Sequence, residues 1–307
     1  MMNKFKLLLG SATVASLLFT LPLTTNADAF SDVEPDDYHY VAITYLKENN
    51  IINGYDDGTF KANQKINRAE ALKMLMLAVH GSEAAALLST PDTSPFTDTP
   101  AEAWFTPYLI AAKDKGIISG YDDGTFKPDQ NVNLVEALKM YLESYDNIIY
   151  PDPAPYLFAD TPYDAWYTGY TAYAAQRGML EIHSTNEIYP DMEISRGYLA
   201  EIIYRMIKAS EGLSFGKATY YYGRTMSDEI TAADTFYSQG LTSAHLELPF
   251  GTVVEVTNLA NGKTVQVKIN DRGPYGPGRV LDLSKTAFSL IADPGTGVIN
   301  VEYKVIE

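Results

Sequence analysis

The last ninety residues of the chain contain several short stretches with the pattern of β-strands. Along residues 264–269, Val265, Val267 and Ile269 share one face of a predicted strand and polar residues share the other. Further β-rich stretches lie at 218–222, 252–257, 280–283 and 298–305. Asn261-Gly262 predicts a two-residue hairpin turn, and Ser284 predicts the cap of a helix that runs through Ile291. Short strands with one or two helices predict a small closed barrel.

The preceding part of the chain follows a helical pattern instead. Residues 108–115 place Leu109, Ile110 and Ala112 on one face, and the glycines of 116–120 end that helix. An Asp-Asp-Gly turn follows, and then Asn67 or Asn133 precedes a second apolar stretch, where an asparagine favours a helix N-cap. The unit therefore reads as two short helices joined by a loop. The Asp-Asp-Gly turn lacks the spacing of an EF-hand calcium loop.

This unit is repeated. Gly54-Tyr-Asp-Asp-Gly-Thr-Phe60 recurs letter for letter at 120–126, and Glu70-Ala-Leu-Lys-Met74 recurs at 136–140. A more divergent third copy begins at Phe158. Two short helices cannot bury their own apolar faces, so three copies should pack together as an all-α bundle. The predicted domains are repeats at 30–81, 95–146 and 157–210, a link at 211–215 and the barrel at 216–307.

The N-terminus has the pattern of a signal peptide over residues 1–29. Lys4 and Lys6 precede an apolar run at 7–23, and Ala27-Asp28-Ala29 is a small-x-small cleavage site. We therefore expect an exported protein. The chain has no cysteine, which excludes disulfides, cysteine-based metal sites and a cysteine-linked lipid anchor.

The net charge and its distribution along the chain limit the partners that we expect the protein to bind. The net charge is −16, and residues 214–307 contribute 8 basic and 10 acidic side chains, so the acidity lies in the repeats. Nucleic acid is not an expected partner, because its phosphates would be repelled. The four histidines are scattered without ligand spacing, so we expect no metal and no cofactor.

The repeats resemble the S-layer homology (SLH) family, whose copies carry the same Phe-x-Asp opening, Trp and Gly-Tyr-x-Asp-Gly-Thr-Phe word. The resemblance implies a three-lobed bundle whose grooves bind secondary cell-wall polysaccharide. It carries wall-polymer-binding roles onto Asp32, Arg68, Asp98, Trp104, Asp160, Trp166 and Arg196. Two positions depart from the family pattern: Tyr38 stands for the Trp of the first copy, and Leu134 stands for the Arg of the second. We therefore expect one or two working grooves. For each Asp or Arg, a role in bracing the repeats remains an equal alternative.

The barrel region resembles the rare lipoprotein A (RlpA) family. The resemblance rests on six words in order, among them Leu241-Thr-Ser-Ala-His245, Ile269-Asn-Asp-Arg-Gly-Pro-Tyr275 and Gly278-Arg-Val-Leu-Asp-Leu-Ser284. It implies a six-stranded double-psi β-barrel, shared with expansins, and lytic transglycosylase activity on peptidoglycan glycan strands. The catalytic residues it implies are Asp271 and His245. The substrate-binding residues it implies are Asp234, Asn270, Arg272, Tyr275 and Tyr237, the last in place of an acidic family residue.

One carboxyl group suffices for this chemistry. It protonates the glycosidic oxygen and then accepts the proton of the C6 hydroxyl, which closes a 1,6-anhydro ring without water as nucleophile. Strand alternation places Asp271 on the apolar face and Asn270 on the polar face, with Arg272 directed away from Asp271.

Other interpretations stay open. Asp271 could brace the following turn, His245 is as easily structural as catalytic, and we expect Asp282 to be scaffold. Tyr237 favours a non-catalytic, expansin-like peptidoglycan-binding module as the alternative function. A third hypothesis is a structural envelope protein in which the barrel is a spacer.

Overall fold

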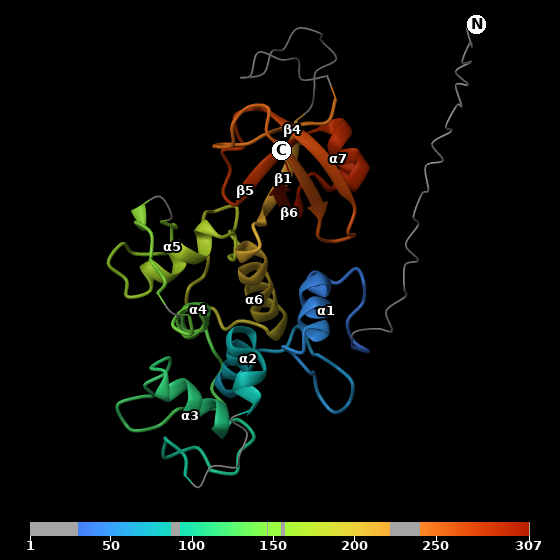
Figure 1. Ribbon diagram of the computed structural model, residues 1–307. Helices are drawn as coiled ribbons and strands as arrows, with labels where there is room; N and C mark the ends of the chain where they lie inside the picture. The colour runs from blue at the N-terminus through green and yellow to red at the C-terminus, as the bar shows by residue number, and fades with distance from the viewer. Residues whose placement is uncertain (1–29, 87–92, 146, 155–156, 222–239, 307) are drawn as a thin grey trace, which may run out of the picture.

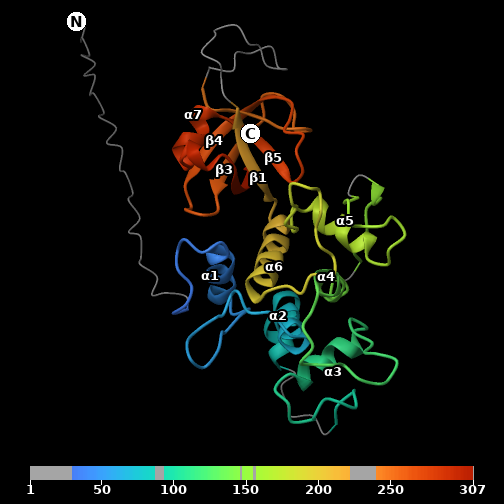
Figure 2. The same cartoon turned by 180° about the vertical axis from the view of Figure 1, so that it is seen from behind.

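The computed structural model describes residues 30–86, 93–145, 147–154, 157–221 and 240–306. Figures 1 and 2 show a group of helices below and a compact set of strands above, joined through α6 and β1. The predicted signal peptide lies outside the described residues. Among the helices that are described, none has the length and apolar character needed to cross a membrane.

Each repeat contributes two helices. They are α1 (Tyr40–Glu48), α2 (Arg68–Ala86), α3 (Thr106–Asp114), α4 (Leu134–Leu142), α5 (Thr168–Gln176) and α6 (Arg196–Ser210). The first helix of one repeat packs on the second helix of another, so that α3 contacts α2, α5 contacts α4 and α1 contacts α6. The last of these pairs closes the three repeats into a ring.

The predicted caps are present at the second helices. Asn133 Oδ1 accepts a hydrogen bond from Glu136 N, and the Glu136 carboxylate accepts one from Asn133 N. Asn67 accepts from Glu70 N at 2.8 Å in the same way. In the third copy Ser195 replaces the asparagine and accepts from Tyr198 N at 3.1 Å. The repeated Asn-x-x-Glu spacing therefore sets where the second helix begins in each of the first two copies.

The C-terminal part is a closed barrel with strand order β1-β5-β2-β4-β3-β6. Its elements are β1 (Ser214–Tyr221), β2 (Thr242–Ala244), β3 (Val253–Asn258), β4 (Thr264–Asp271), β5 (Arg279–Ser284), helix α7 (Lys285–Ile291), a 3-10 turn η2 (Pro294–Thr296) and β6 (Ile299–Val305). The β1–β5 and β2–β4 pairs are parallel and the others antiparallel. The helical repeats and the six-stranded barrel confirm the predicted fold class.

Three local predictions differ from the structure. Strand β1 begins at Ser214, inside the stretch expected as a link, and the three-residue strand β2 was not expected. The hairpin turn is also wrong: Asn258 N donates to Lys263 O, so the loop is four residues long, and Gly262 rather than Asn261 is left-handed. The buried Asn258 side chain explains this, because it donates to Ile291 O at 2.8 Å and accepts from Ala260 N at 2.9 Å.

Candidate functional site

Two carboxylates lie in one row on the outer face of the barrel. Ala244 of β2 pairs with Asp282 of β5 on one side and with Asp271 of β4 on the other. Thr219 of β1 continues the row beyond Asp282. Directly paired residues share a face, and neighbouring strands are about 4.8 Å apart. The carboxylate row (Thr219, Asp282, Ala244, Asp271) therefore sets two acids on either side of a small alanine.

The end of β4 does not continue the simple alternation. Ile269 pairs with Ser243 and Asp271 pairs with Ala244, so Asn270 is an extra residue in a β-bulge. Asn270 is buried, with 4% of its surface exposed, and its predicted position on the polar face is wrong. The bulge brings Asp271 onto the outer face beside Ala244. There Asp271 is half-buried, and its Oδ1 accepts from Arg272 N at 2.8 Å.

Asp282 is the neighbouring acid, and burial is the main influence on its pKa. Its Oδ1 accepts from Thr219 Oγ1 at 2.7 Å. Burial raises the pKa of Asp282, and the negative charge of Asp271 raises it further. Burial also raises the pKa of Tyr221, with both acids adding to the effect. The charges of Asp271 and Asp282 therefore act on Tyr221, and that of Asp271 acts on Asp282. Asp282 was expected to be scaffold. The pattern Leu281-Asp282-Leu283 carried the signal, because two buried leucines direct the residue between them outward.

His245 is held by bonds at both ring nitrogens. Nδ1 accepts from Glu247 N at 3.0 Å and from Leu248 N at 2.9 Å. The network therefore places the ring proton on Nε2, which lies 2.9 Å from the Tyr303 hydroxyl. Burial lowers the pKa of His245, which favours the neutral ring. Its contact with the row is through the backbone, where His245 N donates to Asp271 O at 3.1 Å.

The remaining predicted substrate-binding residues have different surroundings. Arg272 Nη1 donates to His245 O at 3.1 Å and to Leu248 O at 2.9 Å, and its guanidinium stacks 3.7 Å from the Phe250 ring centre. Tyr275 is 82% exposed. Asp234 and Tyr237 lie outside the described residues. Within the residues that the structure describes, no cluster of acidic or histidine side chains is arranged to hold a metal ion.

Two grooves of the repeat ring have matching walls. Groove one runs between α2 and the segment before α3, and groove two between α4 and the segment before α5, with volumes of about 470 and 500 Å³. A quartet of equivalent side chains lines each: Glu70, Lys73, Trp104 and Arg196 in groove one, and Glu136, Lys139, Trp166 and Arg68 in groove two. Each quartet is assembled from all three repeats.

The quartets share the same internal contacts. Lys73 Nζ lies 5.4 Å from the Trp104 ring centre, and Lys139 Nζ lies 5.6 Å from that of Trp166. Arg196 Nη1 lies 3.4 Å from Glu70 Oε1, and Arg68 Nη1 lies 4.0 Å from Glu136 Oε1. The indole rings are 52% and 58% exposed. An exposed ring beside an ammonium group suits a sugar that carries negative charge.

The two arginines also brace the ring of repeats. Arg68 Nε donates to Phe126 O at 3.0 Å, and Arg196 Nε donates to Phe60 O at 2.9 Å. Each of these bonds joins one repeat to another. Sequence reasoning singled out these arginines but missed the Glu and Lys of each quartet. Those residues stand in the Glu-Ala-Leu-Lys-Met word that the first two copies share and the third lacks.

The repeated aspartates close turns. Asp32 accepts from Phe60 N and Lys61 N, both at 2.7 Å, and Asp98 accepts from Phe126 N at 2.8 Å and Lys127 N at 2.7 Å. Asp160 makes the same pair of bonds with Ile188 N and Tyr189 N, so the divergent third copy keeps this geometry. None of the three aspartates lines groove one or two.

Comparison with known proteins agrees with this division. Residues 29–72 and 95–137 match the S-layer homology domain model, and residues 214–303 match a family model described as "lytic transglycolase". The chain carries S-layer homology repeats and an RlpA-like domain. The RlpA-like domain is 44% identical over 103 residues to a probable endolytic peptidoglycan transglycosylase RlpA of Nostoc sp., covering 33% of this chain and 28% of the relative. It is 38% identical over 104 residues to the endolytic peptidoglycan transglycosylase RlpA of Vibrio cholerae, covering 34% and 40%.

The chain thus spans less than half the length of these curated relatives. Among solved structures, the RlpA-like domain is similar to an expansin of Clavibacter michiganensis, with 25% identity and a TM-score of 0.27 over 31% of this chain and 50% of the other. A Streptomyces papain inhibitor matches with 27% identity and a TM-score of 0.26, over 31% of this chain and 94% of the other.

Proposed function

We propose that the protein is an exported lytic transglycosylase that cleaves peptidoglycan glycan strands and is held at the cell wall by its repeats. The observation that carries the proposal is the carboxylate row, which lies on the outer face of a domain that matches the lytic transglycosylase model. The named activity of the RlpA relatives supports the choice of substrate.

In the proposed reaction Asp271 acts first as an acid. Its proton passes to the glycosidic oxygen as the bond from that oxygen to C1 of the muramic acid breaks. The C6 hydroxyl oxygen of the same sugar then bonds to C1, and the Asp271 carboxylate accepts the hydroxyl proton. The product is a 1,6-anhydromuramic end, and the enzyme returns to its starting protonation state.

The surroundings of the row support substrate binding. Burial raises the pKa of Asp282, and the negative charge of Asp271 beside it adds to that effect. Tyr275 offers an exposed ring for a sugar face. Arg272 and His245 position the 245–250 loop next to the row. By family resemblance, Asp234 and Tyr237 complete the substrate-binding set.

The anchoring part of the proposal rests on the two quartets. We assign grooves one and two to an anionic secondary cell-wall polysaccharide, with Trp104 or Trp166 stacking on a sugar ring and Lys73 or Lys139 pairing with its charge. Asp32, Asp98 and Asp160 support the turns that shape the repeats.

Product analysis tests the enzymatic part. Denuded glycan strands incubated with the full chain should yield 1,6-anhydromuramic ends by mass spectrometry. Asp271→Asn should lower the rate by at least about a hundredfold, the lower range of general acid–base catalysis. Glu255→Gln is the matched control, because Glu255 is a barrel-surface carboxylate paired with Lys304 on β6. Intact strands after incubation with folded wild type would refute the enzyme.

A second candidate is a non-catalytic peptidoglycan-binding module. It is favoured by Tyr237 at the position where the RlpA family carries an acid, and by the fully bonded ring of His245. It predicts sedimentation with peptidoglycan that Asp271→Asn leaves unchanged, without new chain ends.

A further inference from the structure

The ring of repeats has a third groove, between α6 and the segment before α1. The four positions equivalent to the quartets are Tyr198, Glu201, Tyr38 and Leu134, as the fixed repeat spacings show. All four residue types differ from those of grooves one and two. Although they come from three repeats, the changes converge on a single groove. Glu201 stands at the position of the lysine, and the buried Leu134 stands at the position of the arginine.

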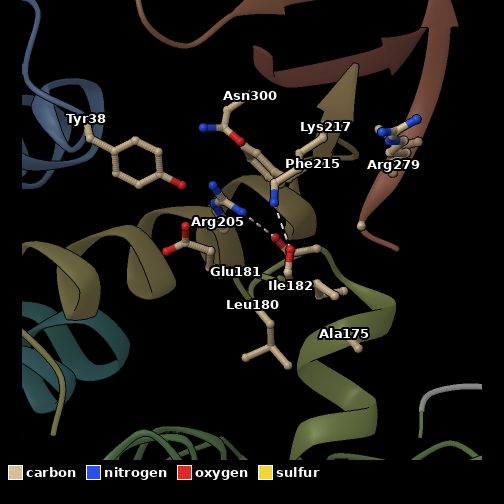
Figure 3. A pocket seen from close by; sticks show the side chains of 14 residues that line it. Tyr38, Ala175, Leu180, Glu181, Ile182, Arg205, Phe215, Lys217, Arg279 and Asn300 are labelled. Carbon is tan, nitrogen blue, oxygen red and sulfur yellow. Dashed lines mark hydrogen bonds between the residues drawn. The ribbon is translucent and has the colours of Figure 1, made fainter. Parts of the chain in front are cut away.

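The replaced residues form a network of their own. Glu201 Oε1 lies 2.7 Å from Arg205 Nε, and its other oxygen lies 3.7 Å from His39 Nδ1. Tyr198 OH accepts from Glu181 N at 3.0 Å. Tyr38 points its hydroxyl toward Arg205 (Figure 3). The Glu201 carboxylate and the Tyr198 hydroxyl are therefore bonded within the repeats.

The barrel packs against the Tyr38 side of this groove. A cavity of about 90 Å³ remains there, against about 500 Å³ in groove two, and half of the residues that line it belong to the barrel. Figure 3 shows Phe215, Lys217 and Asn300 of the barrel next to Arg205 of the repeats, with Tyr38 and Glu181 close by. Lys217 Nζ donates to Ile182 O at 2.7 Å, and Phe215 is 3% exposed. Beside the groove, Tyr204 OH donates to Glu302 Oε2 at 2.9 Å.

The surroundings of Gly178 show how closely the repeats and the barrel approach each other. Gly178 has φ +64°, and a Cβ there would lie 2.5 Å from Phe215 O. The equivalent positions in the other copies are Asn50, with φ 58°, and Gly116, with φ +74° and open space around its Cβ. Asparagine is therefore compatible with this backbone in the first copy. At Gly178 the barrel excludes any side chain.

We infer that groove three is a socket for the barrel of the same chain and not a polymer site. The repeats then form a wall anchor with two polymer sites, and the carboxylate row is held in one orientation relative to that anchor. The number of polymer sites rests on the proposed wall binding, whereas the docking of the barrel does not.

Docking is tested by distance measurement between spin labels. The chain has no native cysteine, so Asp164→Cys in the repeats and Lys263→Cys in the barrel give two unique labels at exposed positions. Pulsed electron–electron double resonance between the two labels should give one narrow distance distribution. Gly178→Asn should broaden it at least about twofold, because the Cβ meets backbone that cannot give way. Gly116→Asn, the same change in open space, should leave it narrow.

A broad distribution in the parent protein, or a narrow one in Gly178→Asn with an unchanged mean, would overturn the socket. The double variant Lys217→Met/Tyr204→Phe removes two polar ties without altering the backbone and should also broaden the distribution. It decides the question if Gly178→Asn does not fold. An unchanged distribution in this double variant would then count against the socket.

The number of polymer sites is tested by co-sedimentation with isolated cell wall that retains its polysaccharide, and with wall stripped of it by acid. Trp104→Ala and Trp166→Ala should each weaken binding at least about tenfold, because loss of either groove removes avidity. Tyr38→Ala should leave binding unchanged. Equal weakening by all three would overturn the two-site anchor. If none weakens binding, the proposed wall anchoring fails, while the spin-label result still decides docking.

Discussion

Arg205 provides the sharpest test of what stabilises the third repeat. It lies one turn after Glu201 on α6, and the two side chains are 5% and 4% exposed, with Nε and Oε1 2.7 Å apart. Arg205 Nη1 also donates to Gly178 O at 2.9 Å. In Arg205→Met the Glu201 carboxylate stays buried without its partner. Removing one member of a buried pair costs about 3–5 kcal/mol, a large part of the 5–15 kcal/mol typical of a domain.

Urea unfolding, followed by the helical circular dichroism signal of the repeats, measures this cost. Arg205→Met should lower the free energy of unfolding at pH 7 by about 3 kcal/mol or more. The double variant Arg205→Met/Glu201→Met should recover most of the loss, because two apolar side chains replace two buried charges. Comparing the single and double variants isolates the pair from the lost packing.

The pH dependence has a defined sign. Burial by itself would raise the pKa of Glu201, but the charges and hydrogen bonds of Arg205 and His39 together outweigh burial, and the pKa lies below its ordinary value of 4.5. The stabilisation by the pair is therefore complete above pH 4.5 and is lost as the pH falls through the lower folded value. The deficit of Arg205→Met should shrink in the same direction. A deficit under about 1 kcal/mol at pH 7, or no recovery in the double variant, would refute this account of the pair.

Two further predictions concern the turn aspartates and the carboxylate row. Asp98→Ala should lower the stability of the repeats by about 2 kcal/mol in urea unfolding, because two backbone amides lose a charged acceptor. Asp98→Asn should lower it by about half as much. Unchanged stability with lost wall binding would show a polymer-binding role instead. Asp282→Asn should raise the calorimetric melting temperature of the barrel at pH 7 but not near pH 3. Burial raises the pKa of Asp282 from 3.8, so the folded state is penalised as pH rises and the carboxylate ionises. An equal gain at both pH values would contradict this.

Much of the fold could be predicted from local patterns. Letter-for-letter repeats require repeated structure, and the Asn-x-x-Glu spacing sets the start of α2 and α4. The alternation along 264–269 predicted which face of β4 enters the barrel core. It failed at Asn270 because a bulge depends on the partner strand. That partner, β2, has three residues and no pattern of its own.

The amino-acid sequence by itself determined the repeats, the barrel class and the separate departures at Tyr38 and Leu134. Only the tertiary structure showed that grooves one and two each draw their walls from three repeats that are distant in the chain, which assigns both departures to equivalent positions of groove three. It likewise decided that Asp282 joins Asp271, since their strands are neighbours of β2 but not of each other. Local patterns specify helices and strand faces, whereas packing between distant segments determines which side chains meet.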